Sequence, residues 1–213
     1  DGLTLYGWHI PGPSKTTLVW FHGNAGNISD RVANISEFQH NLGVNIFIFD
    51  YRGYGLSEGS PSEKGTYMDG DAAIKYITSH ESTDPSRLVF FGRSLGCAVA
   101  AEMAIRHNVY ALVLESGFTS LKAMASRAYP FLPGVGLFTE IFLKTKYDIL
   151  SKLRQIHTPI MLLHGDKDKT VPFDFGLELY EMANPPKRFH TIEGANHNDT
   201  FIVGGTEYFE ALA

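Results

Sequence analysis

The residues best placed to do chemistry lie around Ser94, in the run Gly-Arg-Ser-Leu-Gly at positions 92–96. The apolar run 88–91 before it predicts a strand buried on both faces, and the alanine-rich run 97–105 after it predicts a helix. A serine at such a tight strand-to-helix turn is exposed by the turn and lies above the positive end of the helix. We therefore expect Ser94 to be a nucleophile. The alternative is a glycine-rich turn with an incidental serine.

A serine hydroxyl is a poor nucleophile unless a base accepts its proton, so the chain must supply that base. His197 is the candidate, because it follows the last predicted strand, 187–192, in a loop of small residues. The chain has nine histidines, so a histidine in a loop is weak evidence by itself. The prediction therefore depends on finding an acid that could orient this ring.

Three carboxylates are candidates for that acid. Asp166 and Asp168 follow the predicted buried strand 159–164, and we favour Asp168 because the Val-Pro pair that begins the next helix comes shortly after it. Glu115 is the rival, because it ends the predicted strand 110–115 and some serine enzymes take their acid from the strand after the nucleophile.

An oxyanion site is expected in the loop 22–27, His-Gly-Asn-Ala-Gly-Asn, which follows the predicted buried strand 16–21. The loop is rich in glycine but lacks the Gly-Lys-Ser/Thr ending of a phosphate-binding loop. The backbone N–H of Asn24 is the first candidate for a donor to the oxyanion, and that of Ala25 is the second. The alternative is a structural turn.

Strands and short helices are expected to alternate along the chain. The predicted strands are 3–10, 16–21, 44–49, 88–91, 110–115, 159–164 and 187–192, and the predicted helices are 31–41, 63–79, 97–105, 173–182 and 207–212. Short connections between such elements predict an α/β fold with a mostly parallel sheet covered by helices on both faces. The site of such a fold lies at the carboxyl ends of the strands. His22, Ser94 and Glu115 are all at such ends.

Two local interactions are also expected. The glycine-rich run 50–59 lacks the spacing of a dinucleotide-binding motif, so we expect a structural loop in which Asp50 pairs with Arg52. Asp30 is expected to cap the helix 31–41.

The alternation is interrupted at residues 117–147, which contain no strand-like run and are rich in apolar and aromatic residues. We expect one domain over residues 1–213 with a helical, cap-like insertion at 117–147. Phe118, Met124 and Phe138 are candidate substrate-binding residues of that cap. The other interpretation is a helical layer that covers the core, and both can hold at once.

Composition limits the possible partners. The chain has 213 residues with 44% hydrophobic and 19% charged residues, which is ordinary for a globular domain. Its net charge of −5 gives no electrostatic support for binding nucleic acid, and the single cysteine, Cys97, excludes an internal disulfide. No run is long enough to span a membrane. We expect a cytoplasmic protein, or one associated with a membrane through a segment outside this chain.

Five segments together resemble the α/β-hydrolase superfamily over essentially the whole chain. They are residues 22–27, 50–55, 92–96, 164–172 and 194–199. The order nucleophile, acid, histidine is also that of this fold. The likeness is greatest to small, often membrane-anchored serine hydrolases that include protein depalmitoylases. Many of these relatives have glycine where Cys97 stands, so the turn into the helix is expected to pack differently here.

This resemblance implies Ser94 as nucleophile, His197 as base and Asp168 as acid, with the N–H groups of Leu95 and Asn24 as oxyanion donors. It implies hydrolysis of a small-molecule or acyl-protein ester or thioester, with no metal and no organic cofactor. An acyltransferase or a peptidase would share these residues, and a non-catalytic binding protein would share the fold.

Overall fold

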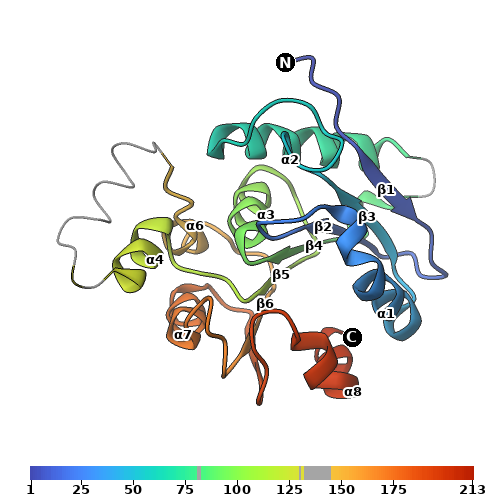
Figure 1. Cartoon of the computed structure of the whole chain (residues 1–213). Coiled ribbons are helices and arrows are strands. Elements are labelled where there is room, and N and C mark those ends of the chain that lie inside the picture. The colour runs from blue at the N-terminus through green and yellow to red at the C-terminus, as the bar shows by residue number, and fades with distance from the viewer. Residues whose placement is uncertain (81–82, 130, 132–144) are drawn as a thin grey trace.

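The computed structural model describes residues 1–80, 83–129, 131 and 145–213, which form a single seven-stranded sheet covered by helices (Figure 1). The strands, in chain order, are β1 (Gly7–Ile10), β2 (Thr17–Phe21), β3 (Asn45–Phe49), β4 (Leu88–Arg93), β5 (Ala111–Glu115), β6 (Ile160–Gly165) and β7 (Lys187–Ile192). Their order across the sheet is β1-β3-β2-β4-β5-β6-β7. Only β1 is antiparallel to its neighbour within this sheet. The predicted mostly parallel α/β architecture is confirmed.

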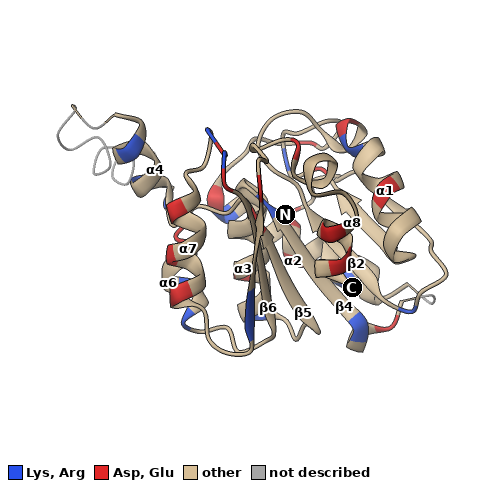
Figure 2. Cartoon of the chain, turned by 90° about the horizontal axis from the view of Figure 1, so that it is seen from below, with Lys and Arg blue, Asp and Glu red and all other residues tan. Residues whose placement is uncertain are grey.

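The helices cover both faces of this sheet. They are α1 (Val32–Leu42), α2 (Glu63–Thr78), α3 (Leu95–Arg106), α4 (Leu121–Ala128), α6 (Ile149–Leu153), α7 (Phe173–Met182) and α8 (Thr200–Leu212), with short 3₁₀ turns at Ile28–Arg31 and Pro85–Arg87. Seen from below, α6 and α7 lie on one side of the strands, and α1 and α8 lie on the other (Figure 2). Acidic and basic residues are interspersed over the helices in that view.

Alternation along the strands divides the buried residues between two cores, because successive side chains of a strand point to opposite faces. In β2, Val19 and Phe21 belong to the core under α2, α3, α6 and α7. Leu18 and Trp20 belong to the core under α1 and α8. The Trp20 ring packs against Phe38 of α1 and Phe91 of β4, with centroids 5.0 Å apart in both pairs. Such aromatic contacts hold the helices and strands in a fixed register.

Some predicted boundaries were wrong. The first strand begins at Gly7 rather than residue 3, and the last helix begins at Thr200 rather than 207, with a bend at Gly205, where φ is 49°. Asp30 does not cap α1. Its carboxylate instead accepts the N–H of Asn27, the residue that caps the preceding 3₁₀ turn.

The predicted pair between Asp50 and Arg52 was also wrong. Arg52 instead pairs with Asp69 of α2, and its Nη2 lies 2.7 Å from Asp69 Oδ1. The Asp50 carboxylate accepts the N–H of Ile28 at 3.0 Å. These two side chains therefore have different partners, Ile28 and Asp69, although they are close in sequence.

The two ends of the predicted insertion lie against each other at its base. The N–H of Leu121 donates to the carbonyl of Lys146 at 3.0 Å, and the N–H of Ile149 donates to that of Thr119 at 2.9 Å. Ser120 caps α4, with its hydroxyl accepting the N–H of Ala123. Phe138 lies outside the described residues.

Candidate active site

Ser94 occupies the turn between β4 and α3. Its φ of 53° and ψ of −117° are unusual for a residue with a Cβ, and such strain typically costs about 1–3 kcal/mol and gathers at functional sites. The Ser94 N–H donates to the carbonyl of Glu115 on the neighbouring strand at 2.9 Å. A Cβ on Gly96 would overlap the carbonyl oxygen of Phe21, and one on Gly92 would lie 2.6 Å from the carbonyl oxygen of Gly96. The close approach of strand and helix therefore requires both glycines.

The predicted oxyanion loop lies against this turn. A Cβ on Gly23 would lie 3.3 Å from the Cβ of Ser94 and 4.0 Å from its Oγ. The following residue, Asn24, is exposed, and its side-chain oxygen accepts a 2.7 Å hydrogen bond from the Tyr54 hydroxyl. Ala25 has a φ of 70°, so the loop turns sharply directly after Asn24. The structure thus places the loop that carries Asn24 and Ala25, the first and second candidate oxyanion donors, next to Ser94.

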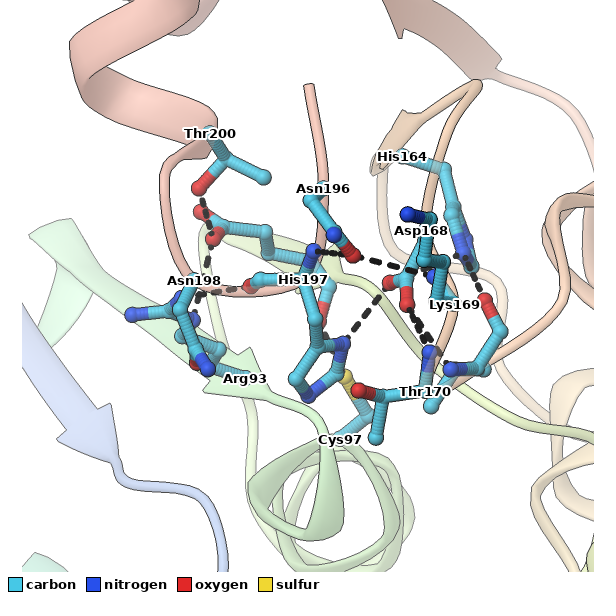
Figure 3. Close-up of polar contacts among 12 residues, drawn as sticks. Arg93, Cys97, His164, Asp168, Lys169, Thr170, Asn196, His197, Asn198 and Thr200 are labelled. Carbon is cyan, nitrogen blue, oxygen red and sulfur yellow. Dashed lines mark hydrogen bonds and ion pairs between the residues drawn. The ribbon is translucent and has the colours of Figure 1, made fainter.

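His197 and Asp168 are in direct contact (Figure 3). The Nδ1 atom of His197 lies 2.7 Å from Asp168 Oδ2, while Asp168 Oδ1 accepts the N–H groups of Thr170 and Val171, both at 2.8 Å. A carboxylate at Nδ1 keeps a proton on that atom and leaves Nε2 with its lone pair free to accept one. The pair therefore has the arrangement of a general base and the acid that orients it.

A second histidine, which the sequence did not indicate as part of the site, supports Asp168. His164 is buried, with its Nε2 2.9 Å from the carbonyl of Val171 and 3.5 Å from Asp168 Oδ2. Burial alone would raise the pKa of the Asp168 carboxyl. Contacts with His164 and His197 and the Val171 N–H outweigh burial and hold that pKa well below its usual range. Asp168 is therefore ionised at neutral pH.

Asp166, the alternative acid in the same loop, has another role. Its Oδ1 accepts the N–H of Gly194 at 2.6 Å. Gly194 begins the loop 194–199 that carries His197, which we call the histidine loop. Asn196 joins the same two loops, because its Oδ1 accepts the N–H of Lys169 at 3.0 Å and that of His197 at 2.8 Å (Figure 3). These bonds fix the histidine loop on the loop that carries Asp168.

Glu115, the rival acid on the neighbouring strand, is buried and bonded elsewhere. Its Oε1 lies 3.2 Å from Arg93 Nε and accepts the Thr200 hydroxyl at 2.7 Å. Its Oε2 accepts the Tyr208 hydroxyl at 2.5 Å. Of the three candidate carboxylates, the structure brings only Asp168 to His197.

His22, which precedes the oxyanion loop, is fully buried. Its Nδ1 lies 2.8 Å from the carbonyl of Gly23, and its own carbonyl accepts the Tyr51 hydroxyl at 3.1 Å. Its Nε2 is 3.4 Å from Asp50 Oδ1 but forms no hydrogen bond. Burial lowers the pKa of His22 to about 4, so the ring is neutral near pH 7.

Cys97 lies beneath the turn, at the position where glycine was expected from the resemblance. The buried thiol donates to the carbonyls of Gly92 at 3.1 Å and Glu115 at 3.2 Å. Burial raises the pKa of this thiol, so it stays protonated and unreactive at neutral pH. Its side chain fills space between α3 and the start of the segment after β5, where a Cβ on Gly117 would lie 3.3 Å from Sγ.

The candidate substrate-binding residues differ in their surroundings. Phe118 is only 4% exposed and belongs to the core between the sheet and α3. Met124, on α4, is half-buried and packs against the same core. Phe118 therefore has a packing role in the core, and its role in binding substrate stays a prediction.

The described residues also bear on membrane spans and metal sites. Within them, no helix is both long and apolar enough to cross a bilayer. Within the same residues, no three His, Cys, Asp or Glu side chains lie together in a way that could hold a metal ion.

Comparison with known proteins agrees with the fold. A family model described as alpha/beta hydrolase fold matches residues 16–136. An uncharacterised protein of Mycobacterium tuberculosis is 36% identical over 215 residues, covering 100% of this chain and 74% of that protein. The alpha/beta hydrolase domain-containing protein WAV2 of Arabidopsis thaliana is 34% identical over 226 residues, covering 99% of this chain and 73% of WAV2.

A solved structure gives the same result. The Pyrococcus furiosus esterase Pf2001 superposes with a TM-score of 0.78 at 23% identity, over 99% of this chain and 85% of the esterase. An identity this low shows the fold alone. The family model, which covers more than half of the chain, and the two relatives above 30% identity carry the assignment. The chain belongs to the alpha/beta hydrolase family.

Proposed function

We propose that this protein is a serine hydrolase that cleaves carboxylic esters or thioesters through an acyl-Ser94 intermediate. The observation that carries the proposal is the 2.7 Å contact between His197 Nδ1 and Asp168 Oδ2 in a fold that places Ser94 at a strained turn. The esterase likeness of the fold supports the reaction class. The resemblance to depalmitoylases favours an acyl-protein thioester as one candidate substrate and a small ester as another.

The proposed reaction begins when Ser94 Oγ attacks the carbonyl carbon and His197 Nε2 takes the hydroxyl proton. Asp168 stays ionised and stabilises the imidazolium that forms. The N–H groups of Leu95 and Asn24 hold the tetrahedral oxyanion, and each such donor is typically worth about 2.7–4 kcal/mol. Collapse of this intermediate breaks the bond to the alcohol or thiol, which leaves with the proton from His197.

The second half of the reaction regenerates the enzyme. His197 takes a proton from water, and the resulting hydroxide attacks the acyl-Ser94 carbonyl. The oxyanion donors act again, and Ser94 leaves with the proton from His197 as the carboxylic acid is released. An acyltransferase would differ only in using an alcohol or amine in place of this water. Hydrolysis and transfer are separated by product analysis with an added alcohol, and a peptidase by amide turnover.

The proposal is tested with p-nitrophenyl esters of about two to sixteen acyl carbons and with fluorophosphonate labelling, using the wild type and Ser94→Ala. We expect the wild type to label and turn over esters, and both signals to vanish in Ser94→Ala. Ser116→Ala is a matched control, because Ser116 is a second serine with positive φ (51°) directly after a strand, but it is fully buried. Label retained in Ser94→Ala, or a wild type that neither labels nor turns over any ester, would overturn the proposal.

A further inference from the structure

We propose that Arg93 is a positioning residue, whose guanidinium holds the backbone of His197 in register with Ser94. This inference rests on the proposed function. Arg93 directly precedes the nucleophile at the end of β4, whereas His197 lies in the loop after β7. Two further strands, β5 and β6, separate β4 from β7 in the sheet, so nucleophile and base come from distant parts of the fold.

The contact that joins these two parts is short and buried. Arg93 Nη2 donates to the carbonyl oxygen of His197 at 2.6 Å and reaches the side-chain oxygen of Asn198 at 3.4 Å (Figure 3). The Arg93 residue is only 6% exposed, so solvent competes little for this bond. A hydrogen bond to the backbone of His197 fixes the Cα from which its ring extends. Asp168 fixes the imidazole ring of the same residue through its contact with Nδ1.

The guanidinium is itself held in place by a buried network. Glu115 Oε1 lies 3.2 Å from Arg93 Nε, and the Thr200 and Tyr208 hydroxyls of α8 donate to the two oxygens of the same carboxylate. Glu115 thus neutralises the buried cation and anchors the helix that follows the histidine loop. A buried charge needs a counter-charge and hydrogen-bond partners, and here Glu115, the His197 carbonyl and the two hydroxyls supply them.

The chemistry of arginine fits this role better than that of lysine. A guanidinium presents several N–H donors in a rigid plane, so one side chain can meet Glu115 with Nε and His197 with Nη2. A lysine at position 93 would keep the charge but could not contact the Glu115 carboxylate and the His197 carbonyl in the same geometry. Arg93→Lys is therefore expected to preserve the pairing with Glu115 while loosening His197.

Arg52→Lys provides a matched control. Arg52 is also buried and pairs with two carboxylates: its Nε and Nη2 lie 3.0 Å and 2.7 Å from Asp69 Oδ1, and its Nη1 lies 2.9 Å from Asp1 Oδ2. It lies in the loop after β3, and its hydrogen bonds and ion pairs within the described residues go to Asp1 and Asp69. Both substitutions replace a buried guanidinium with an ammonium that cannot make the same set of hydrogen bonds, so both are expected to lower the melting temperature. Only the change at Arg93 is expected to affect the reaction.

The test measures kcat and KM with a p-nitrophenyl ester, and the second-order rate of fluorophosphonate labelling, at a temperature where each variant is folded by circular dichroism. We expect Arg93→Lys to lower kcat and the labelling rate by about tenfold to a hundredfold with KM little changed, since misplacing a catalytic group by about 1 Å can cost about a hundredfold. Arg52→Lys is expected to change neither rate. Equal, small effects of the two variants on both rates would overturn the proposal and leave Arg93 a purely structural residue.

A second variant covers the case in which Arg93→Lys does not fold. Thr200→Val keeps the shape of the side chain but removes the hydrogen bond to the Glu115 oxygen that faces Arg93. We expect a smaller loss in kcat and in labelling, again without a change in KM, and unchanged rates would refute the inference. Inactivity of the wild type, by contrast, would refute the proposed function first, so the two failures are distinguishable.

Discussion

Acidification is expected to destabilise the protein through His22, the buried histidine beside the oxyanion loop. Burial lowers its pKa from 6.5 to about 4 in the folded state. Between these two pH values the unfolded chain binds a proton on this ring and the folded chain does not, so stability falls as pH falls. Each pKa unit is worth about 1.4 kcal/mol, and the full shift is therefore worth about 3 kcal/mol. Stability is unaffected by this group above the ordinary histidine range, and the loss levels off below about pH 4.

The assay is urea unfolding of the wild type and His22→Asn at several pH values from about 7.5 down to 4.5. The asparagine amide can still donate to the carbonyl of Gly23, as His22 Nδ1 does, but it takes up no proton. We expect the stability difference between the two proteins to change by about 2.5 kcal/mol over this range, in favour of the variant at low pH. His157→Asn, the same change at a solvent-exposed histidine, is measured in parallel as the control for the substitution itself. A flat difference for His22→Asn, or one of opposite slope, would refute the reasoning.

Three other substitutions test the geometry of the site. Asp168→Asn should lower kcat by about 10⁴, as in a serine-protease triad, while Asp166→Asn in the same loop should retain most activity in the ester assay. The stability difference between the wild type and Asp168→Asn should shrink as pH falls below about 4, because a carboxyl whose folded pKa is depressed loses its contribution on protonation. Gly96→Ala should unfold at a clearly lower temperature by calorimetry, with an overpacking cost of about 1–3 kcal/mol or more, because the added Cβ would overlap the carbonyl of Phe21. A Gly96→Ala melting temperature equal to that of the wild type would contradict the close approach of helix and strand.

The sheet and the nucleophile turn could be predicted because both leave strong local patterns. Buried parallel strands appear as continuous apolar runs, and the turn needs small residues on either side of Ser94. Lys187–Ile192 and Phe173–Met182 were predicted to the residue. The first strand was predicted too long, because apolar alternation at residues 3–6 continues where pairing with β3 has not yet begun.

The partners of charged residues were harder to predict, because they depend on contacts distant in sequence. Asp50 and Arg52 are neighbours in sequence, yet Arg52 meets Asp69 on a helix that begins after the intervening loop. Arg93 occupies the variable position of the Gly-x-Ser-x-Gly pattern, so the motif gives no sign that its guanidinium reaches a backbone 104 residues later in the chain. His164 was likewise missed, because its contact with Asp168 appears only once the loop after β6 has folded back.

The choice of acid and the identity of residue 93 are linked in this protein. Glu115 ends the strand beside the nucleophile and was a reasonable alternative acid from sequence. To orient His197 it would have to leave Arg93, and the guanidinium would then be a buried cation without a counter-ion, which is far more costly than the loss of one hydrogen bond. With Glu115 committed to Arg93, Thr200 and Tyr208, the acid must come from another strand end, and the loop after β6 supplies Asp168.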